Sequence, residues 1–191
     1  MLNLGNETSG LGFTLIELMV VISIIGLFAS VVLASVNDAR LNAQYTIARA
    51  NIKQLADLIE FAKGTKLQTL PEITGSFCSE CACRNGTVLP TSNIHEYPTS
   101  HACFTSYLNI IDILNNSTGG LYTIKNAPID PWGAPFLFNE NEGEGGVCGM
   151  DNLASAGPNG IYYDSDDVIY NIPSVKCGAN PVTHHPNTNW R

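Results

Sequence analysis

The sequence predicts an α+β fold in which a long N-terminal α-helix packs on a small antiparallel β-sheet. Three observations lead to this prediction. An apolar run of 24 residues, 13–36, lies near the start of the chain. Apolar residues with helical spacing follow it, and no proline occurs before Lys63. After Gly64 the composition changes to glycine, proline, asparagine, serine and threonine around short β-like runs, which is typical of a compact domain rich in turns.

Length and composition restrict the class of protein. The 191 residues suffice for about one ordinary domain and an extension. Hydrophobic residues make up 45% of the chain and charged residues 14%, below the roughly 25% charged residues of an average soluble protein. A membrane or an assembly must therefore cover part of the apolar surface. The net charge of −8 repels phosphate backbones, so we expect no direct nucleic-acid partner.

The apolar run 13–36 is long enough to cross a bilayer as a helix, which needs about 20 residues. Its one charged residue is Glu17, and a lone carboxylate within hydrocarbon costs on the order of 2.5–3.5 kcal/mol. A secretory signal peptide has a small-residue cleavage site after its apolar run, whereas here the small residue, Gly12, precedes it. Glu17 therefore either meets an opposite charge or reaches the membrane surface from an ordinary anchor.

A stripe of apolar residues predicts that the helix continues through 37–63. The stripe members are three or four residues apart, which places them on one helical face. They are Leu41, Tyr45, Ala48, Ile52, Leu55 and Ile59. We expect the C-terminal domain of the same chain to cover this stripe. Lys63 followed by Gly64 predicts the end of the helix.

Residues 64–191 form the predicted globular domain. Strands are expected at 121–124, at 135–138, and at 161–163 or 168–172. Residues 107–114 could form a short helix or a strand. Asp130 and Pro131 predict a proline turn that starts with an aspartate side chain and is followed by a buried Trp132.

An acidic loop, 155–168, is a candidate metal site. Three carboxylates within four residues repel one another unless a hard cation collects them, and a loop rich in glycine and asparagine exposes carbonyl oxygens. The sequence therefore favours calcium over a solvated acidic turn, although the loop lacks the EF-hand pattern. The expected ligands are Asp164, Asp166, Asp167, Asn159 and the backbone near Ser155.

Six cysteines predict disulfides if the domain is exported. They are Cys78, Cys81, Cys83, Cys103, Cys148 and Cys177. Six cysteines allow 15 connectivities; we expect Cys148 and Cys177 to pair near the acidic loop and the other four to close the middle segment. A less favoured alternative is a zinc knuckle, in which Cys78, Cys81 and Cys83 act with Cys103 or His101. No catalytic constellation is recognisable, and the CxxC lacks a βαβ context, so we expect no enzyme.

The N-terminal segment resembles the type IV prepilin family. The likeness rests on the consecutive residues Gly12, Phe13, Thr14, Leu15, Ile16 and Glu17 and on the unbroken apolar stretch behind them. The resemblance implies that a membrane peptidase cuts after Gly12 and methylates the Phe13 amine. Residues 1–12 would then be a leader, 13–36 the membrane and later filament-core half of the helix, and 37–63 its amphipathic half. Glu17 of one subunit would pair with the Phe13 amine of a neighbour and set the stagger between subunits.

Two further segments resemble the major pseudopilin of type II secretion and its pilin relatives. They are the turn Asp130-Pro131-Trp132-Gly133 and the acidic loop 155–168, which in that family binds calcium. The resemblance implies a pilin-like fold. It also implies a structural subunit of a type IV pilus or of a type II secretion pseudopilus.

Such a subunit waits in the inner (cytoplasmic) membrane as a single-pass precursor in the lipid bilayer and then joins a periplasmic or extracellular filament. The implied partners are copies of itself, minor pilins, the prepilin peptidase, and an assembly platform with its ATPase. The alternative is an exported metal- or ligand-binding module with a single permanent membrane anchor, which would not need Glu17.

Overall fold

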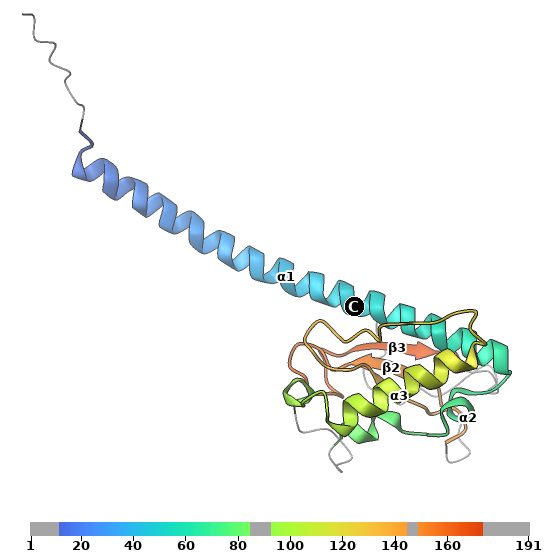
Figure 1. Ribbon diagram of the computed structural model, residues 1–191. Coiled ribbons are helices and arrows are strands. Elements are labelled where there is room, and N and C mark those ends of the chain that lie inside the picture. The colour runs from blue at the N-terminus through green and yellow to red at the C-terminus, as the bar shows by residue number, and fades with distance from the viewer. Residues whose placement is uncertain (1–11, 85–92, 145–148, 174–191) are drawn as a thin grey trace, which may run out of the picture. The chain divides into compact units, whose positions relative to one another are not determined.

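The computed structural model describes residues 12–84, 93–144 and 149–173 and has the expected α+β architecture (Figure 1). Its main elements are a long helix, α1, a second helix, α3, and a three-stranded antiparallel sheet. The chain separates into two compact units, 1–42 and 43–191.

Helix α1 spans Leu15–Lys66 and has defined ends. At its start the Thr14 hydroxyl accepts a hydrogen bond from the Glu17 N–H, and the Glu17 carboxylate accepts one from the Thr14 N–H. This reciprocal arrangement is a capping box. The helix continues past the predicted stop at Gly64 and ends at Lys66. The next residue, Leu67, takes a positive φ of 55° and donates its N–H to the Lys63 carbonyl at 2.8 Å, which terminates the helix.

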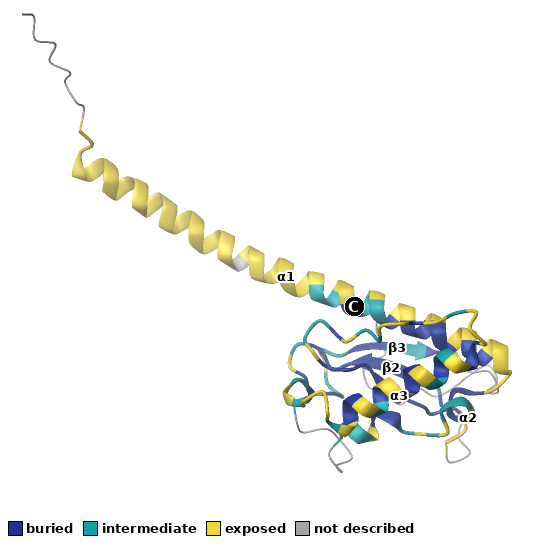
Figure 2. Ribbon diagram, viewed as in Figure 1, coloured by how far each residue is buried: buried dark blue, intermediate teal, exposed yellow. Residues whose placement is uncertain are grey.

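The part of α1 that lies in the first unit exposes its apolar side chains (Figure 2). Phe13 is 91% exposed within the single chain, and the other described side chains up to Asn42 are exposed as well. By length and composition, α1 is the one helix among the described residues that could cross a membrane. Exposure of this much apolar surface to water is unfavourable, so something outside the chain must cover it.

The second unit buries the predicted stripe of α1. Ala48, Ile52, Leu55 and Ile59 are fully buried, whereas Leu41 lies in the first unit and is exposed. The stripe shares one core with side chains from α3 and from all three strands. This core confirms that the chain's own C-terminal domain covers the helix. The largest fully buried partners are Phe136, Phe138, Leu70, Leu114, Leu153 and Ile172.

The sheet has the order β1-β2-β3, with β1 at Leu137–Asn139, β2 at Asp151–Ser155 and β3 at Val168–Ile172. Both pairs are antiparallel, and Leu153 of β2 lies opposite Phe138 on one side and Tyr170 on the other. The strand predicted at 168–172 is confirmed, and the one at 135–138 overlaps β1.

Strand β2 was not predicted. Aspartate, asparagine and serine are rare in strands, but all five residues of β2 are buried and their polar groups find partners. The Asp151 carboxylate accepts hydrogen bonds from the N–H groups of Asn141 and Glu142, both at 2.9 Å. The Ser155 hydroxyl donates to Asp130 at 2.7 Å. Tertiary partners therefore outweigh the weak local preference.

Two predicted strands, 121–124 and 161–163, are wrong. In segment 121–124, the Asn115 side chain forms hydrogen bonds with both backbone groups of Ile124. It accepts from the Ile124 N–H at 2.8 Å and donates to the Ile124 carbonyl at 3.0 Å. The backbone groups of Ile124 therefore need no hydrogen bonds from a neighbouring strand. In the second, Tyr163 has a positive φ of 86°, which a strand does not accommodate.

The remaining elements are helical. Helix α2 spans Leu70–Thr74, and two short 3-10 helices, η1 and η2, span Ser79–Cys83 and Ile94–Glu96. Helix α3 spans Ala102–Ser117, so the segment 107–114 is helical and longer than expected. The Tyr107 ring of α3 lies 6.0 Å from the Phe138 ring of β1, which packs the helix against the sheet.

Candidate functional site

The predicted processing and assembly residues lie at the start of α1. Gly12 and Phe13 precede the helix and are exposed. The Thr14 N–H and hydroxyl both donate to the same Glu17 oxygen, Oε2, at 2.8 Å. These bonds are to neutral groups, and no ion pair to Glu17 forms among the described residues. This cap was not predicted, although a threonine three residues before a glutamate is its usual pattern.

The acidic loop brings three of the predicted metal ligands together between β2 and β3. Each of Asp164, Asp166 and Asp167 offers a carboxylate oxygen within 4.8 Å of the others. The Asp167 carboxylate also accepts the N–H groups of Tyr163 at 2.6 Å and Asp164 at 3.1 Å. Backbone N–H groups of the loop therefore bind the cluster, and the three aspartate side chains are half-buried.

At the other two predicted positions, the side chains make hydrogen bonds within the chain. Asn159 directs its amide nitrogen to Asp164 at 2.7 Å, and its oxygen accepts the Ile161 N–H at 2.6 Å. A metal-binding role for Asn159 would need its amide to turn. The Ser155 hydroxyl donates to Asp130 in the turn at 130–133, and the predicted role of the backbone near Ser155 as a ligand stays a prediction.

The charged form of the Asp166 carboxyl is electrostatically disfavoured in the loop. Partial burial raises the pKa of Asp166 to about 7, and a hydrogen bond and repulsion from Asp164 add to the rise. Its buried Oδ1 atom has no hydrogen-bond partner among the described residues. A Cβ at Gly157, which has φ +61°, would lie 2.5 Å from the Asp166 carbonyl oxygen. Only glycine therefore lets the loop backbone approach Asp166 this closely.

The turn at 130–133 has the predicted chemistry. The Asp130 carboxylate accepts the N–H groups of Trp132 at 3.1 Å and Ala134 at 2.8 Å. Burial raises the pKa of Asp130. Trp132 is half-buried, less than predicted, and meets the Tyr45 ring of α1 edge-on at 5.2 Å. Tyr45 also donates its hydroxyl to the Asp166 carbonyl at 3.4 Å, so one residue of α1 contacts both this turn and the acidic loop.

Comparison with known proteins identifies the N-terminal segment. A model described as the prokaryotic N-terminal methylation motif matches residues 11–33, which include Gly12, Phe13, Glu17 and most of the exposed apolar part of α1. This match supports a relationship of the chain to pilins and pseudopilins.

A curated relative supports the same family over most of the pilin-like chain. The type II secretion system core protein G of Escherichia coli (strain K12) is 29% identical over 161 residues. The match covers 82% of this chain and 88% of that protein. No solved structure matches the chain significantly.

Four of the six cysteines of this pilin-like chain form disulfides, as predicted for the middle segment. Cys78 pairs with Cys81 and Cys83 with Cys103. Cys148 and Cys177 lie outside the described residues, and their pairing stays a prediction. A zinc knuckle needs free thiolates, and in the structure all four of these sulfurs are in disulfides. The zinc alternative therefore stays a prediction that applies only to the reduced chain. His101 caps α3 instead, and its Nδ1 accepts the Cys103 N–H at 3.2 Å.

A buried lysine connects the end of α1 to other segments of the second unit. Lys63 is 3% exposed and forms ion pairs with Glu142 at 3.2 Å and Asp151 at 3.4 Å. It also donates to the Pro173 carbonyl at 2.9 Å. The sequence analysis assigned Lys63 only to the last turn of the helix. Its position four residues after Ile59 extends the buried stripe, and that spacing could have revealed it.

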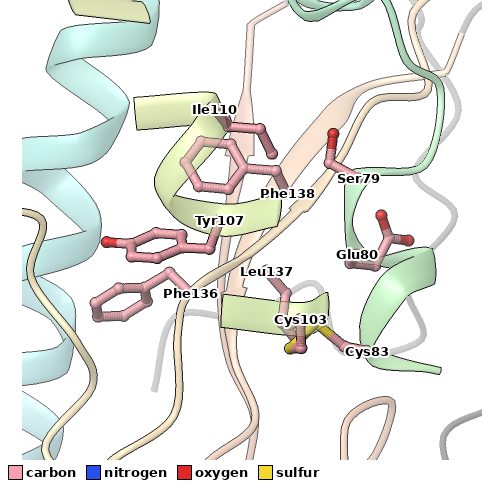
Figure 3. Close-up of a pocket in the computed structure, with 9 residues that line it drawn as sticks. All are labelled: Ser79, Glu80, Cys83, Cys103, Tyr107, Ile110, Phe136, Leu137 and Phe138. Atoms are coloured by element: carbon pink, nitrogen blue, oxygen red, sulfur yellow. A yellow bond between two sulfur atoms is a disulfide. The ribbon is translucent and has the colours of Figure 1, made fainter. Parts of the chain in front are cut away.

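Two glutamates are buried at η1: Glu80 within it, and Glu140 next to it. The Glu140 carboxylate accepts the Ser79 N–H at 2.8 Å and also the Ser79 hydroxyl. Glu80 pairs with Arg84, and burial raises the pKa of Glu80 to about 8. Ser79 and Glu80 border a narrow apolar pocket lined by Tyr107, Phe136 and Phe138, and the Cys83–Cys103 disulfide forms part of its wall (Figure 3).

Proposed function

We propose that this chain is a structural subunit of a type IV pilus or of a type II secretion pseudopilus. A prepilin peptidase cuts after Gly12, and mature subunits polymerise through the N-terminal half of α1. The observation that carries this proposal is the exposed apolar helix with a single acid, Glu17, inside a methylation motif. The family relationship and the fold support a pilin-like filament subunit in general.

The physical argument starts from what covers residues 13–36. Before assembly, lipid solvates these side chains and holds the subunit as a single-pass precursor in the inner membrane. After assembly, the same surface packs against the helices of other subunits in a periplasmic or extracellular filament. Contacts of this head-to-tail kind do not close on themselves and so build open helical filaments.

Glu17 gives the assembly its register. Cleavage after Gly12 creates a positive amine at Phe13, and that amine on one subunit neutralises Glu17 on the next. A buried ion pair adds little net stability but strongly penalises misplacement, because a shifted subunit leaves two unpaired charges in apolar surroundings. The proposal therefore includes copies of this chain, minor pilins, the peptidase, and an assembly platform with its ATPase as partners.

Removal of the Glu17 charge tests the proposal. We expect Glu17→Ala and Glu17→Gln both to abolish filaments, while each variant still inserts into the membrane. The Gln variant separates charge from capping, because its amide oxygen can still accept the Thr14 hydrogen bonds. Asp38→Asn, which neutralises an exposed acid further along α1, is the matched control and should assemble normally.

The measurements are electron microscopy of sheared filaments and resistance of the membrane-bound protein to carbonate extraction. Normal filaments from Glu17→Gln would contradict the charge-pairing proposal. Wild-type protein that stays in the membrane and forms no filaments would instead favour an anchored exported module, which gains membrane stability when the charge is lost.

We also propose that the acidic loop binds calcium. Support comes from the three clustered carboxylates, the raised pKa of Asp166 and its unpartnered buried oxygen. A divalent cation would offset the repulsion among these groups and would accept backbone carbonyl and water oxygens as further ligands.

A further inference from the structure

The two disulfides next to η1 differ in exposure. Cys81 is exposed and Cys78 is half-buried, so their bond lies at the surface. Cys83 and Cys103 are 4% and 1% exposed. Figure 3 shows the sulfurs of this second disulfide beside Leu137, within the apolar pocket. Only the first bond is open to attack by a thiolate in solution.

The position of η1 does not depend on the exposed disulfide. The Ser79 N–H and hydroxyl bind the Glu140 carboxylate at the end of β1. The Ser106 hydroxyl of α3 donates to the Ser79 carbonyl at 3.1 Å. The buried Cys83–Cys103 disulfide joins the end of η1 to the first turn of α3. Three contacts therefore hold η1 in place when the Cys78–Cys81 bond is open.

The two bonds also differ in what they contribute to folding. Cys78 and Cys81 are three residues apart, whereas Cys83 and Cys103 are 20 apart. In the chain-entropy account, a disulfide restricts the unfolded chain less when the loop that it closes is shorter. The short, exposed bond can therefore open with little loss of stability. The long, buried bond is a structural staple.

We propose that Cys78–Cys81 is a thiol–disulfide exchange site on the folded subunit, which reacts with an external dithiol of the kind found in thiol oxidoreductases. Exposed disulfides are the ones that exchange readily, since the attacking thiolate must reach one sulfur along the axis of the bond. This site belongs to the second unit and includes no residue of the N-terminal half of α1, so the inference does not depend on the filament proposal.

The exchange proceeds in two balanced steps. A thiolate of the dithiol attacks the exposed Cys81 sulfur and forms a mixed disulfide, while the Cys78 sulfur leaves as a thiolate and takes a proton from water. The second thiol of the partner loses its proton and attacks its own sulfur in the mixed disulfide, releasing Cys81 as a thiolate that is then protonated. The dithiol is oxidised to a disulfide, and Cys78 and Cys81 are reduced to two thiols.

Limited reduction of the full-length protein in detergent tests the proposal, with dithiothreitol as the dithiol. Samples are quenched with iodoacetamide at intervals, and mass spectrometry quantifies labelling at each cysteine separately. We expect Cys78 and Cys81 to be labelled roughly tenfold or more faster than Cys83 and Cys103. Near-ultraviolet circular dichroism should keep its native signal while the first pair is labelled.

A double variant and a monothiol complete the test. Cys78→Ser with Cys81→Ser should remove only the fast labelling and should leave the slow labelling of Cys83 and Cys103 unchanged. Reduced glutathione should form its mixed disulfide mainly at Cys81. Equal labelling rates for the two pairs, loss of the native signal during the first reduction, or glutathione mainly on Cys78 would each overturn the proposal.

Discussion

At the scale of single residues, the second unit depends on charges that are buried and paired. Lys63 meets Glu142 and Asp151, and all three side chains are almost inaccessible. A buried pair contributes little compared with apolar packing, but the loss of one partner leaves a charge that has neither water nor a counter-ion. Such residues should therefore be sensitive to single substitutions.

Substitution of Lys63 tests this sensitivity. Lys63→Met keeps most of the side-chain volume but leaves Glu142 and Asp151 without their cation, so we expect a loss of about 3–5 kcal/mol in unfolding free energy. Lys53→Met, which breaks the exposed pair with Asp57, is the control and should have little effect. Denaturant unfolding monitored by circular dichroism measures both. Equal effects of the two substitutions would show that burial of the Lys63 cluster is unimportant.

Glu80 predicts a pH dependence of stability. Burial raises its pKa from the ordinary 4.5 to about 8, so the folded state holds the proton more tightly than the unfolded state does. This contribution is fully present below about pH 4.5 and is lost as the pH rises toward about 8. We expect Glu80→Gln to make the decline of the melting temperature over this range shallower.

The exposed Glu96→Gln variant is the control for the pH experiment and should keep the wild-type slope. Burial also raises the pKa values of Asp130, Glu140 and Asp151, so these groups likewise lower stability as the pH rises. The quantity to compare is therefore the slope of melting temperature against pH in each variant. A Glu80→Gln slope identical to that of the wild type would contradict the assignment.

At the scale of elements, the acidic loop and the turn at 130–133 meet α1 at Tyr45. The Tyr45 ring contacts Trp132, and its hydroxyl reaches the Asp166 carbonyl. A cation in the loop would therefore stabilise a segment that packs directly on α1. Both contacts lie within the second unit.

Calcium binding is measurable as a change in thermal stability. Calcium should raise the melting temperature of the full-length protein, and a chelator should reverse the rise, because a ligand that binds only the folded state stabilises it. Asp166→Ala combined with Asp167→Ala should abolish the response. Asp112→Asn, on the exposed side of α3, should retain it. A wild-type protein that responds to neither calcium nor chelator has no such site.

At the scale of the whole molecule, the chain combines a unit that covers its own core with one that exposes its apolar surface. The apolar stripe from Ala48 to Ile59 is buried by other segments of the same chain, whereas residues 13–33 are exposed. An isolated subunit with this composition needs lipid or other subunits. This division matches a precursor that is stored in a membrane and later moved into a filament.

Processing of the N-terminus is the prediction at this scale. Protein purified from cells should begin at Phe13, with a methylated amine, and should lack residues 1–12. Mass spectrometry of the intact protein and N-terminal sequencing measure both features. A chain that assembles with its bond between Gly12 and Phe13 uncut has no amine at Phe13 to neutralise Glu17, and the assembly proposal would then be wrong.

Local patterns in the sequence were enough to predict several elements. The spacing of Ala48, Ile52, Leu55 and Ile59 predicted the buried face of α1, and Asp130 predicted its turn. The alternative of a strand at 168–172 was correct as well. Each of these features depends on side chains and backbone groups that are close in sequence, so neighbouring residues carry the necessary information.

Other features were decided only by tertiary structure, because their partners are far apart in the chain. Strand β2 is polar and exists because Asp151 and Ser155 find partners in other segments. Ser155 binds Asp130, 25 residues away, and so its side chain turns from the acidic loop. The disulfide pairing and the buried position of Lys63 likewise depend on which distant segments the fold brings together. Periodicity shows which face of an element is buried, but it does not show which polar group of a distant segment will contact that face.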